Sequence, residues 1–234
     1  MADLSERQWF YRVGGVAAVV GALLGMVGNL IHPATGGPGE PASTARVVAD
    51  SGAWIPIHLA IVVGLVLMLG GLAAVCQSIR GGLAGALARL GLAAAIVGTT
   101  VGIVLVSLDG FAAKHLADAW LAAPADGREA AHSAFNAVDA MNFALLSPFN
   151  LVFAGFTFVL YGMAGALSRI YPAWLGWLVV IAGVGGSVSG VIQAWIGEPT
   201  AVTTAIGIAA PTVITLWLLV MGLLLIRLDP ERVG

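Results

Sequence analysis

His58 and Asp109 are the two side chains whose types and positions best suit acid–base chemistry. His58 lies in the apolar run Ile55–Ile61, where a polar side chain is costly unless it faces protein or water. Asp109 ends another apolar segment, and the helix dipole disfavours a carboxylate at a helix C-terminus. Asp109 therefore needs a partner, which Lys114, His115 or His58 could supply. Because imidazole titrates near neutrality, a histidine–carboxylate pair can exchange protons at physiological pH.

Both residues also have a plainer interpretation, which the sequence leaves open. His58 could be a neutral imidazole bonded to a neighbouring helix, and Asp109 an interfacial carboxylate in water. Further polar residues are predicted to lie at the same end of the molecule as His58 and Asp109, and they are candidate ligand-binding groups: His32, Asn29, His115, Asp139, Asn142, Asn150, Gln193 and Glu198. Among these, the carboxylates suit ordinary loop positions, and the amides suit hydrogen bonding between helices.

The sequence assigns no metal and no cofactor. Three histidines and one carboxylate could meet at one end of a bundle, but no HxxxH or HExxH pair is present. These four residues are His32, His58, His115 and Asp109. The predicted membrane spans contain no lysine for a retinal Schiff base, and no histidine follows His132 to serve a rhomboid-type serine protease. The single cysteine, Cys76, excludes an internal disulfide and a multi-cysteine metal site.

The composition requires that membrane helices position these side chains. Of the 234 residues, 59% are hydrophobic and only 9% are charged, which is too few charges for a water-facing surface. The net charge of −2 without a basic cluster argues against a nucleic-acid partner. Six runs are long enough to span a bilayer: 12–31, 55–78, 88–108, 141–167, 174–196 and 204–226. We therefore predict a single all-α domain, a six-helix membrane bundle.

The positions of the arginines and the single lysine predict the orientation of the bundle. With both termini in the cytoplasm, seven of these residues lie inside and three, Arg46, Lys114 and Arg128, lie outside. The outer loops are then residues 32–53 and 109–140, and all four histidines fall on the outer half. Within these loops, 42–50 and the stretch after Asp126 have helical patterns, so the fourth span should project outward and then kink at Pro148.

Small residues recur at the same offsets in three spans. Starting from Gly14, Gly91 and Gly176, glycine or another small or apolar residue follows after seven, eleven and fourteen positions. This spacing places each set on one helix stripe, where a neighbouring backbone can approach closely. Together with the arginine-ended return spans, the stripes predict three pseudo-repeated hairpins, and they also offer a surface for oligomer formation. In this register Asp109 occupies the position of His32.

Two segments resemble a known group of proteins. Leu108–Trp120 and Tyr171–Trp177 are similar to a group of multi-pass proteins common in actinobacteria and described as a membrane domain of unknown function. The resemblance covers most of the chain, and it implies a six-span fold in a bacterial plasma membrane. It implies no activity. Integral-membrane terpene cyclases are similar in size and helix content only.

The favoured hypothesis is a membrane protein with an outward-facing polar pocket for an apolar or amphipathic small molecule of lipid or prenyl type. If it is an enzyme, Asp109 and His58 would be the acid–base pair. Two other functions stay open: a transporter or sensor without chemistry, and a structural subunit of a membrane complex. Membrane lipids are expected partners under all three hypotheses.

Overall fold

The structure is a computed structural model that describes residues 2–35, 41–197, 200–229 and 231. These residues form helices with no strand among them, as the sequence predicts. Six helical stretches of the described chain are long and apolar enough to cross a membrane: Leu4–Ile31, Trp54–Ser78, Gly82–Ala122, Arg128–Ser168, Ala173–Ile196 and Ala201–Ile226. The protein is therefore a multi-pass membrane protein by helix length and composition.

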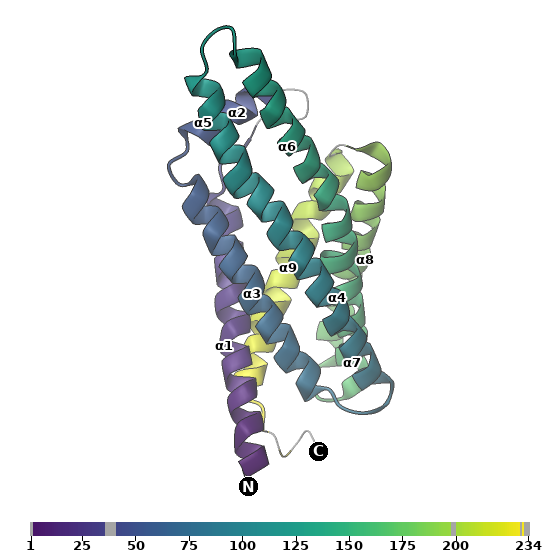
Figure 1. Cartoon of the computed structure of the whole chain (residues 1–234). Helices are drawn as coiled ribbons and strands as arrows, with labels where there is room; N and C mark the ends of the chain where they lie inside the picture. The colour runs from purple at the N-terminus through teal and green to yellow at the C-terminus, as the bar shows by residue number, and fades with distance from the viewer. Residues whose placement is uncertain (1, 36–40, 198–199, 230, 232–234) are drawn as a thin grey trace.

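The elements follow one another along the chain in the arrangement drawn in Figure 1. In order they are α1 (Ala2–Ile31), α2 (Pro41–Asp50), α3 (Trp54–Ser78), α4 (Gly82–Ser107), the π-helix η1 (Leu108–Ala112), α5 (Ala113–Ala122), α6 (Arg128–Pro148), the π-helix η2 (Phe149–Thr157), α7 (Phe158–Ser168), α8 (Ala173–Ile196) and α9 (Ala201–Ile226).

The glycine stripes are the surfaces on which these helices pack. On α1, a Cβ at Gly21 would lie 2.7 Å from the backbone nitrogen of Met68 on α3. On α4, a Cβ at Gly98 would lie 2.7 Å from Phe153 of η2. Each stripe therefore lets one backbone approach another more closely than any larger residue allows.

The third stripe faces the span before it rather than the span after it. A Cβ at Gly176 would lie within 2.5–2.6 Å of Gly162 and Ala166 backbone atoms on α7, and one at Gly183 would lie 2.8 Å from the Val159 nitrogen. The first two stripes pack instead on the following span. The predicted threefold repeat of hairpins thus stays a prediction, although the stripes themselves are packing surfaces within the chain.

Helices α1 and α9 cross closely at one end and separate toward the other (Figure 1). At the crossing, a Cβ on Gly15 would lie 2.6 Å from the Gly222 carbonyl oxygen. The start of α1 and the end of α9 lie at this same end of the bundle, opposite α2 and α5 (Figure 1). We call the end that carries α2 and α5 the cap end.

The cap end is more helical than the sequence analysis expected. Residues 109–140, expected as a loop with a helix in its second part, instead continue α4 through η1 and α5 before α6 begins at Arg128. The alanine-rich α5 sequence favours a helix, and its Lys114–Asp118 ion pair at 2.8 Å spans one turn. The predicted short helix within 42–50 is present as α2, and the helix after Asp126 as α6. A small separate core holds the cap together, formed by Ala45, Val48, Trp54, Ala113, Ala117, Trp120 and Phe135.

Two π-helices interrupt the long spans, and each follows from the local sequence. Pro148 ends α6, and η2 begins at the next residue, because proline offers no N–H to the carbonyl one turn earlier. η1 contains Asp109 and Gly110 between α4 and α5. Such segments are rare, and they often occur at functional sites.

Candidate functional site

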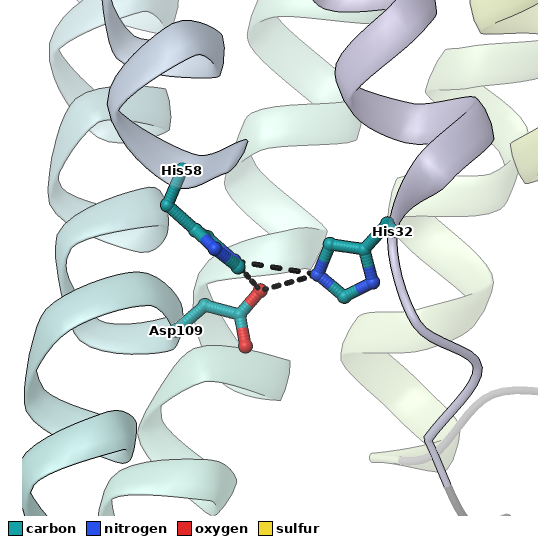
Figure 2. Close-up of side chains that lie close together, drawn as sticks. All are labelled: His32, His58 and Asp109. Carbon is teal, nitrogen blue, oxygen red and sulfur yellow. Dashed lines mark hydrogen bonds and ion pairs between the residues drawn. The ribbon is translucent and has the colours of Figure 1, made fainter. Parts of the chain in front are cut away.

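Three side chains from three spans converge at the cap end of the bundle (Figure 2). The His58 Nε2 atom lies 3.0 Å from Asp109 Oδ2 and 3.3 Å from His32 Nε2. The third side of this triangle, from His32 Nε2 to Asp109 Oδ2, measures 3.8 Å. His58 is 1% exposed, whereas the other two side chains are 25% and 29% exposed. The structure thereby brings together three of the residues that the sequence singled out.

Trp54 holds two members of this triangle in place. Its carbonyl oxygen lies 2.7 Å from His58 Nδ1, one helical turn along α3. Its indole Nε1–H donates to the Asp109 carbonyl oxygen at 2.9 Å, which ties α3 to η1. The indole also packs against both imidazoles, with ring centroids 4.9 Å from His58 and 4.7 Å from His32. Trp54 itself is fully buried, so its position is fixed by the cap.

Gly110 is the second supporting residue that the sequence analysis did not identify. It is buried in η1 directly against the His58 side chain, and a Cβ there would overlap the His58 Cβ and Cγ atoms. The absence of a side chain therefore lets η1 approach α3 closely enough for the neighbouring Asp109 to reach His58. The only sequence signal was a glycine next to a candidate carboxylate, which is weak by itself.

His32 follows the last residue of α1, and its environment favours the neutral imidazole. Its Nδ1 atom lies 3.0 Å from the Pro33 carbonyl oxygen. Burial lowers the pKa of His32 below its ordinary value of 6.5, and His58 adds to this, while the Asp109 carboxylate opposes it. At neutral pH the His32 Nε2 atom therefore carries a lone pair directed into the triangle.

The two backbone contacts fix the tautomers of both histidines. A carbonyl oxygen can only accept, so each Nδ1 must carry the proton that it donates. In the neutral state both Nε2 atoms are then acceptors, and they face each other and the Asp109 carboxylate. Three acceptors that converge without a proton repel one another. A cation between them, either a shared proton or a metal ion, would remove this repulsion.

A cavity of about 480 Å³ extends from this triangle into the bundle. Helices α1, α3, α4 and α9, together with η1, η2 and the ends of α6 and α8, contribute its walls. Its lining is mainly apolar, with Ile61, Leu65, Met68, Leu105, Val106, Leu146, Phe149, Phe153 and Ile214 among the side chains. All three members of the triangle line it as well. The cavity therefore combines apolar walls with one charged end.

A second polar group lies elsewhere on the cavity wall. Asn150 Nδ2 donates to Gln193 Oε1 at 2.8 Å, which leaves the Asn150 amide oxygen and the Gln193 amide nitrogen available for a ligand. On α9 both Gly207 and Pro211 line the cavity, and Pro211 offers no N–H to the Gly207 carbonyl. Hydroxyl groups of Thr203, Thr204 and Thr215 lie on the same helix.

The remaining candidate residues fall outside the triangle. His115 is exposed on α5, and Lys114 bonds Asp118 and the Ala49 carbonyl oxygen rather than Asp109. Asn29 lines the cavity and bonds the Gly25 carbonyl oxygen of its own helix at 2.8 Å. Of the α6 residues, Asp139 is partly buried and close enough to Asp109 for the two carboxylates to repel, and Asn142 is buried. Glu198 lies outside the described residues.

Comparison of the chain with protein families, curated proteins and solved structures found no match in any of the three. The conclusions about function therefore rest on the site itself.

Proposed function

We propose that this protein binds an apolar or amphipathic small molecule, of lipid or prenyl type, in the cavity at the cap end. The observation that carries the proposal is the cavity of about 480 Å³ with apolar walls and His58 and Asp109 at one end. Pockets for small molecules have this character, with mostly hydrophobic walls and a few polar groups that fix orientation. An amphipathic ligand would place its polar end at the triangle and its apolar part against the walls.

The separation of α1 and α9 supports access from the side. Lining residues on the facing edges of these helices are exposed, among them Asn29 on α1 and Thr204, Gly207 and Ile208 on α9. A membrane-spanning bundle presents such an edge to lipid, so a ligand could enter from the bilayer without crossing an aqueous phase. We place the cap end on the outer side of a bacterial plasma membrane, with both termini cytoplasmic, because the positive residues are biased in that sense.

Proton exchange is the chemistry that the triangle suits best. The Nδ1 contact with Trp54 fixes the His58 ring, so its Nε2 atom is presented to Asp109 Oδ2 at 3.0 Å. A proton held between these two atoms lies at the cavity wall, where a bound polar group could take it or supply another. His58 and Asp109 would then act as the acid–base pair.

Two alternatives receive less support. A transporter needs a route to the other end of the bundle, yet α1 and α9 meet backbone to backbone at Gly15 and Gly222 there. A structural subunit would use exposed glycine stripes as its interface. The stripe residues Gly21, Gly98 and Gly176 instead contact neighbouring helices of the same chain.

The test is to purify the protein from its own membrane and identify what remains bound by native mass spectrometry. We expect one apolar or amphipathic molecule per chain. The identified molecule or its precursor should be converted by the wild type and not by Asp109→Asn or His58→Ala. The ligand proposal would be contradicted if the purified wild type carried no such molecule and also took none up from added lipid extract. Full activity in both variants would contradict the acid–base roles.

A further inference from the structure

We propose that His32, His58 and Asp109 together bind one divalent first-row transition metal ion of the zinc type. The sequence assigns no metal here, because the three residues come from three separate spans. The inference concerns the same atoms as the proposed function. A bound ion takes the place of the proton between His58 and Asp109, so metal binding and proton exchange by this pair exclude each other, whereas ligand binding in the cavity is compatible with either.

The first argument is the direction of the lone pairs. Both Nδ1 atoms are occupied by backbone carbonyls, at 3.0 Å for His32 and 2.7 Å for His58. Histidines that bind metals commonly donate their second N–H to such a carbonyl, which fixes the tautomer and the ring orientation. Both Nε2 lone pairs and Asp109 Oδ2 therefore point to one common position (Figure 2).

The second argument is the spacing of the three atoms. Zinc binds histidine nitrogen and carboxylate oxygen at about 2.0–2.1 Å, so two ligands in a tetrahedral site are about 3.3 Å apart. The observed separations of 3.3, 3.0 and 3.8 Å bracket that value. One ligand atom from each residue lies within 4.8 Å of the others. A single ion can thus contact all three without rearrangement of the backbone.

The third argument is the ligand set and its surroundings. Two imidazoles and one carboxylate favour zinc, iron or cobalt over calcium and magnesium, which prefer oxygen ligands. The Trp54 indole N–H donates to the backbone carbonyl oxygen of Asp109, and the indole ring packs on both imidazoles. All three ligands line the cavity, so a fourth coordination position would open into it. Three protein ligands with one open position are typical of catalytic zinc.

A proton shared between His58 and Asp109 is the alternative to a metal ion at this position. The proton and the metal ion differ in whether they require His32. A proton between His58 and Asp109 uses the 3.0 Å contact alone, and it survives loss of His32. A metal ion needs all three ligands. Removal of His32, which is partly exposed and lies beyond the end of α1, therefore distinguishes a bound metal ion from a shared proton and leaves the His58–Asp109 contact in place.

The experiment uses full-length protein without a polyhistidine tag, stripped with chelator in detergent. Zn²⁺ is measured by elemental analysis after dialysis, and Co²⁺ by its visible absorption, which is intense for a tetrahedral site. We expect one ion per chain. Binding should weaken at least about tenfold in His32→Ala, His58→Ala and Asp109→Asn, and it should be unchanged in His115→Ala, whose side chain is exposed outside the triangle.

Two results would overturn the proposal. One is a wild type that shows no tetrahedral Co²⁺ spectrum, and the other is equal binding in His32→Ala and wild type. Thermal melting of each apo variant shows whether it folds, and His32→Ala remains informative if His58→Ala does not. If no metal binds, the proposals of a ligand in the cavity and of proton exchange by His58 and Asp109 still stand on their own tests. If metal binds but no ligand is retained, only the metal site is supported.

Discussion

Gly110 lies directly against the His58 side chain, with no room between them for a Cβ atom. The contact joins η1 to α3 at the point where Asp109 must reach the His58 imidazole. The distance between the Asp109 carboxylate and His58 therefore depends on Gly110, which contributes no functional group of its own.

Gly110→Ala should push His58 and Asp109 apart while favouring helix in the segment that carries Asp109. We expect Co²⁺ affinity to fall about tenfold or more, as is usual when the support of a metal ligand is disturbed. Gly165→Ala is the matched control, because Gly165 is also a buried helical glycine but nothing lies within 4 Å of a Cβ there. Equal affinity in the two variants would show that the close approach at Gly110 is not needed.

Trp54→Phe should destabilise the cap end more than an equivalent change elsewhere. Loss of the indole N–H leaves the Asp109 carbonyl oxygen without its bond from α3, at a cost of about 1–3 kcal/mol. Trp217→Phe is the comparison, since Trp217 is equally buried but its Nε1 has no hydrogen-bond partner among the described residues. Reversible unfolding in detergent measures both, and equal free energies of unfolding would contradict the role of the Trp54 bond.

Metal binding should depend on pH through His32. A protonated imidazole cannot be a ligand, so affinity falls as acid protonates His32. Because burial lowers the pKa of His32 from 6.5, the neutral form persists below that value. The midpoint of the decline in Co²⁺ absorbance should thus lie below pH 6.5. A decline with its midpoint above 6.5 would contradict this assignment.

Gly207→Leu should obstruct the cavity without disturbing the packing of helices. Gly207 lines the cavity on α9, and nothing lies within 4 Å of a Cβ at that position. The amount of co-purified apolar ligand should decrease severalfold, as measured by mass spectrometry. Gly70→Leu adds the same side chain at an exposed glycine of α3 that does not line the cavity, and it should leave retention unchanged. A ligand that is retained equally in both variants lies elsewhere.

Gly183→Ala should be destabilising, whereas the neighbouring Gly185→Ala should be nearly neutral. A Cβ at Gly183 would lie 2.8 Å from the backbone nitrogen of Val159, whereas the atom nearest to a Cβ at Gly185 would be Ile206 Cγ2, at 3.5 Å. Overpacking against backbone costs about 1–3 kcal/mol. Unfolding titrations in mixed detergent micelles can resolve that difference. Similar stabilities would mean that the α7–α8 contact is looser than the glycine stripe indicates.

The sequence named all three residues of the triangle, but only among ten candidates, because it shows which polar groups lie near the ends of apolar spans and not which of them meet. The glycine register placed Asp109 and His32 at equivalent positions, and they lie 3.8 Å apart. His115 was grouped with them by residue type and by its place in the predicted outer half near Asp109, and the helical continuation through α5 carries it to an exposed side.

The supporting structure could not be predicted in the same way. The Gly110 contact and the Trp54 bond each depend on how α3 lies against η1, which is a property of two helices rather than of either sequence. The cavity likewise depends on the angle at which α1 and α9 separate after their crossing at Gly15 and Gly222. Local sequence patterns predict which face of a helix is buried but not the angle at which two helices pack.

The short π-helix η1 has a genetic consequence. A five-residue π-turn between two α-helices is the structure that insertion of one residue into a continuous α-helix produces. Deletion of a single codon within 108–112 would let α4 continue into α5 as an unbroken α-helix, because five residues of the wider π-helix turn through about the same angle as four residues of an α-helix. Helix α5 would then keep nearly its present direction, while the local widening that holds Asp109 and Gly110 against α3 would be lost. One codon thus decides whether the helix wall beside His58 is regular or widened.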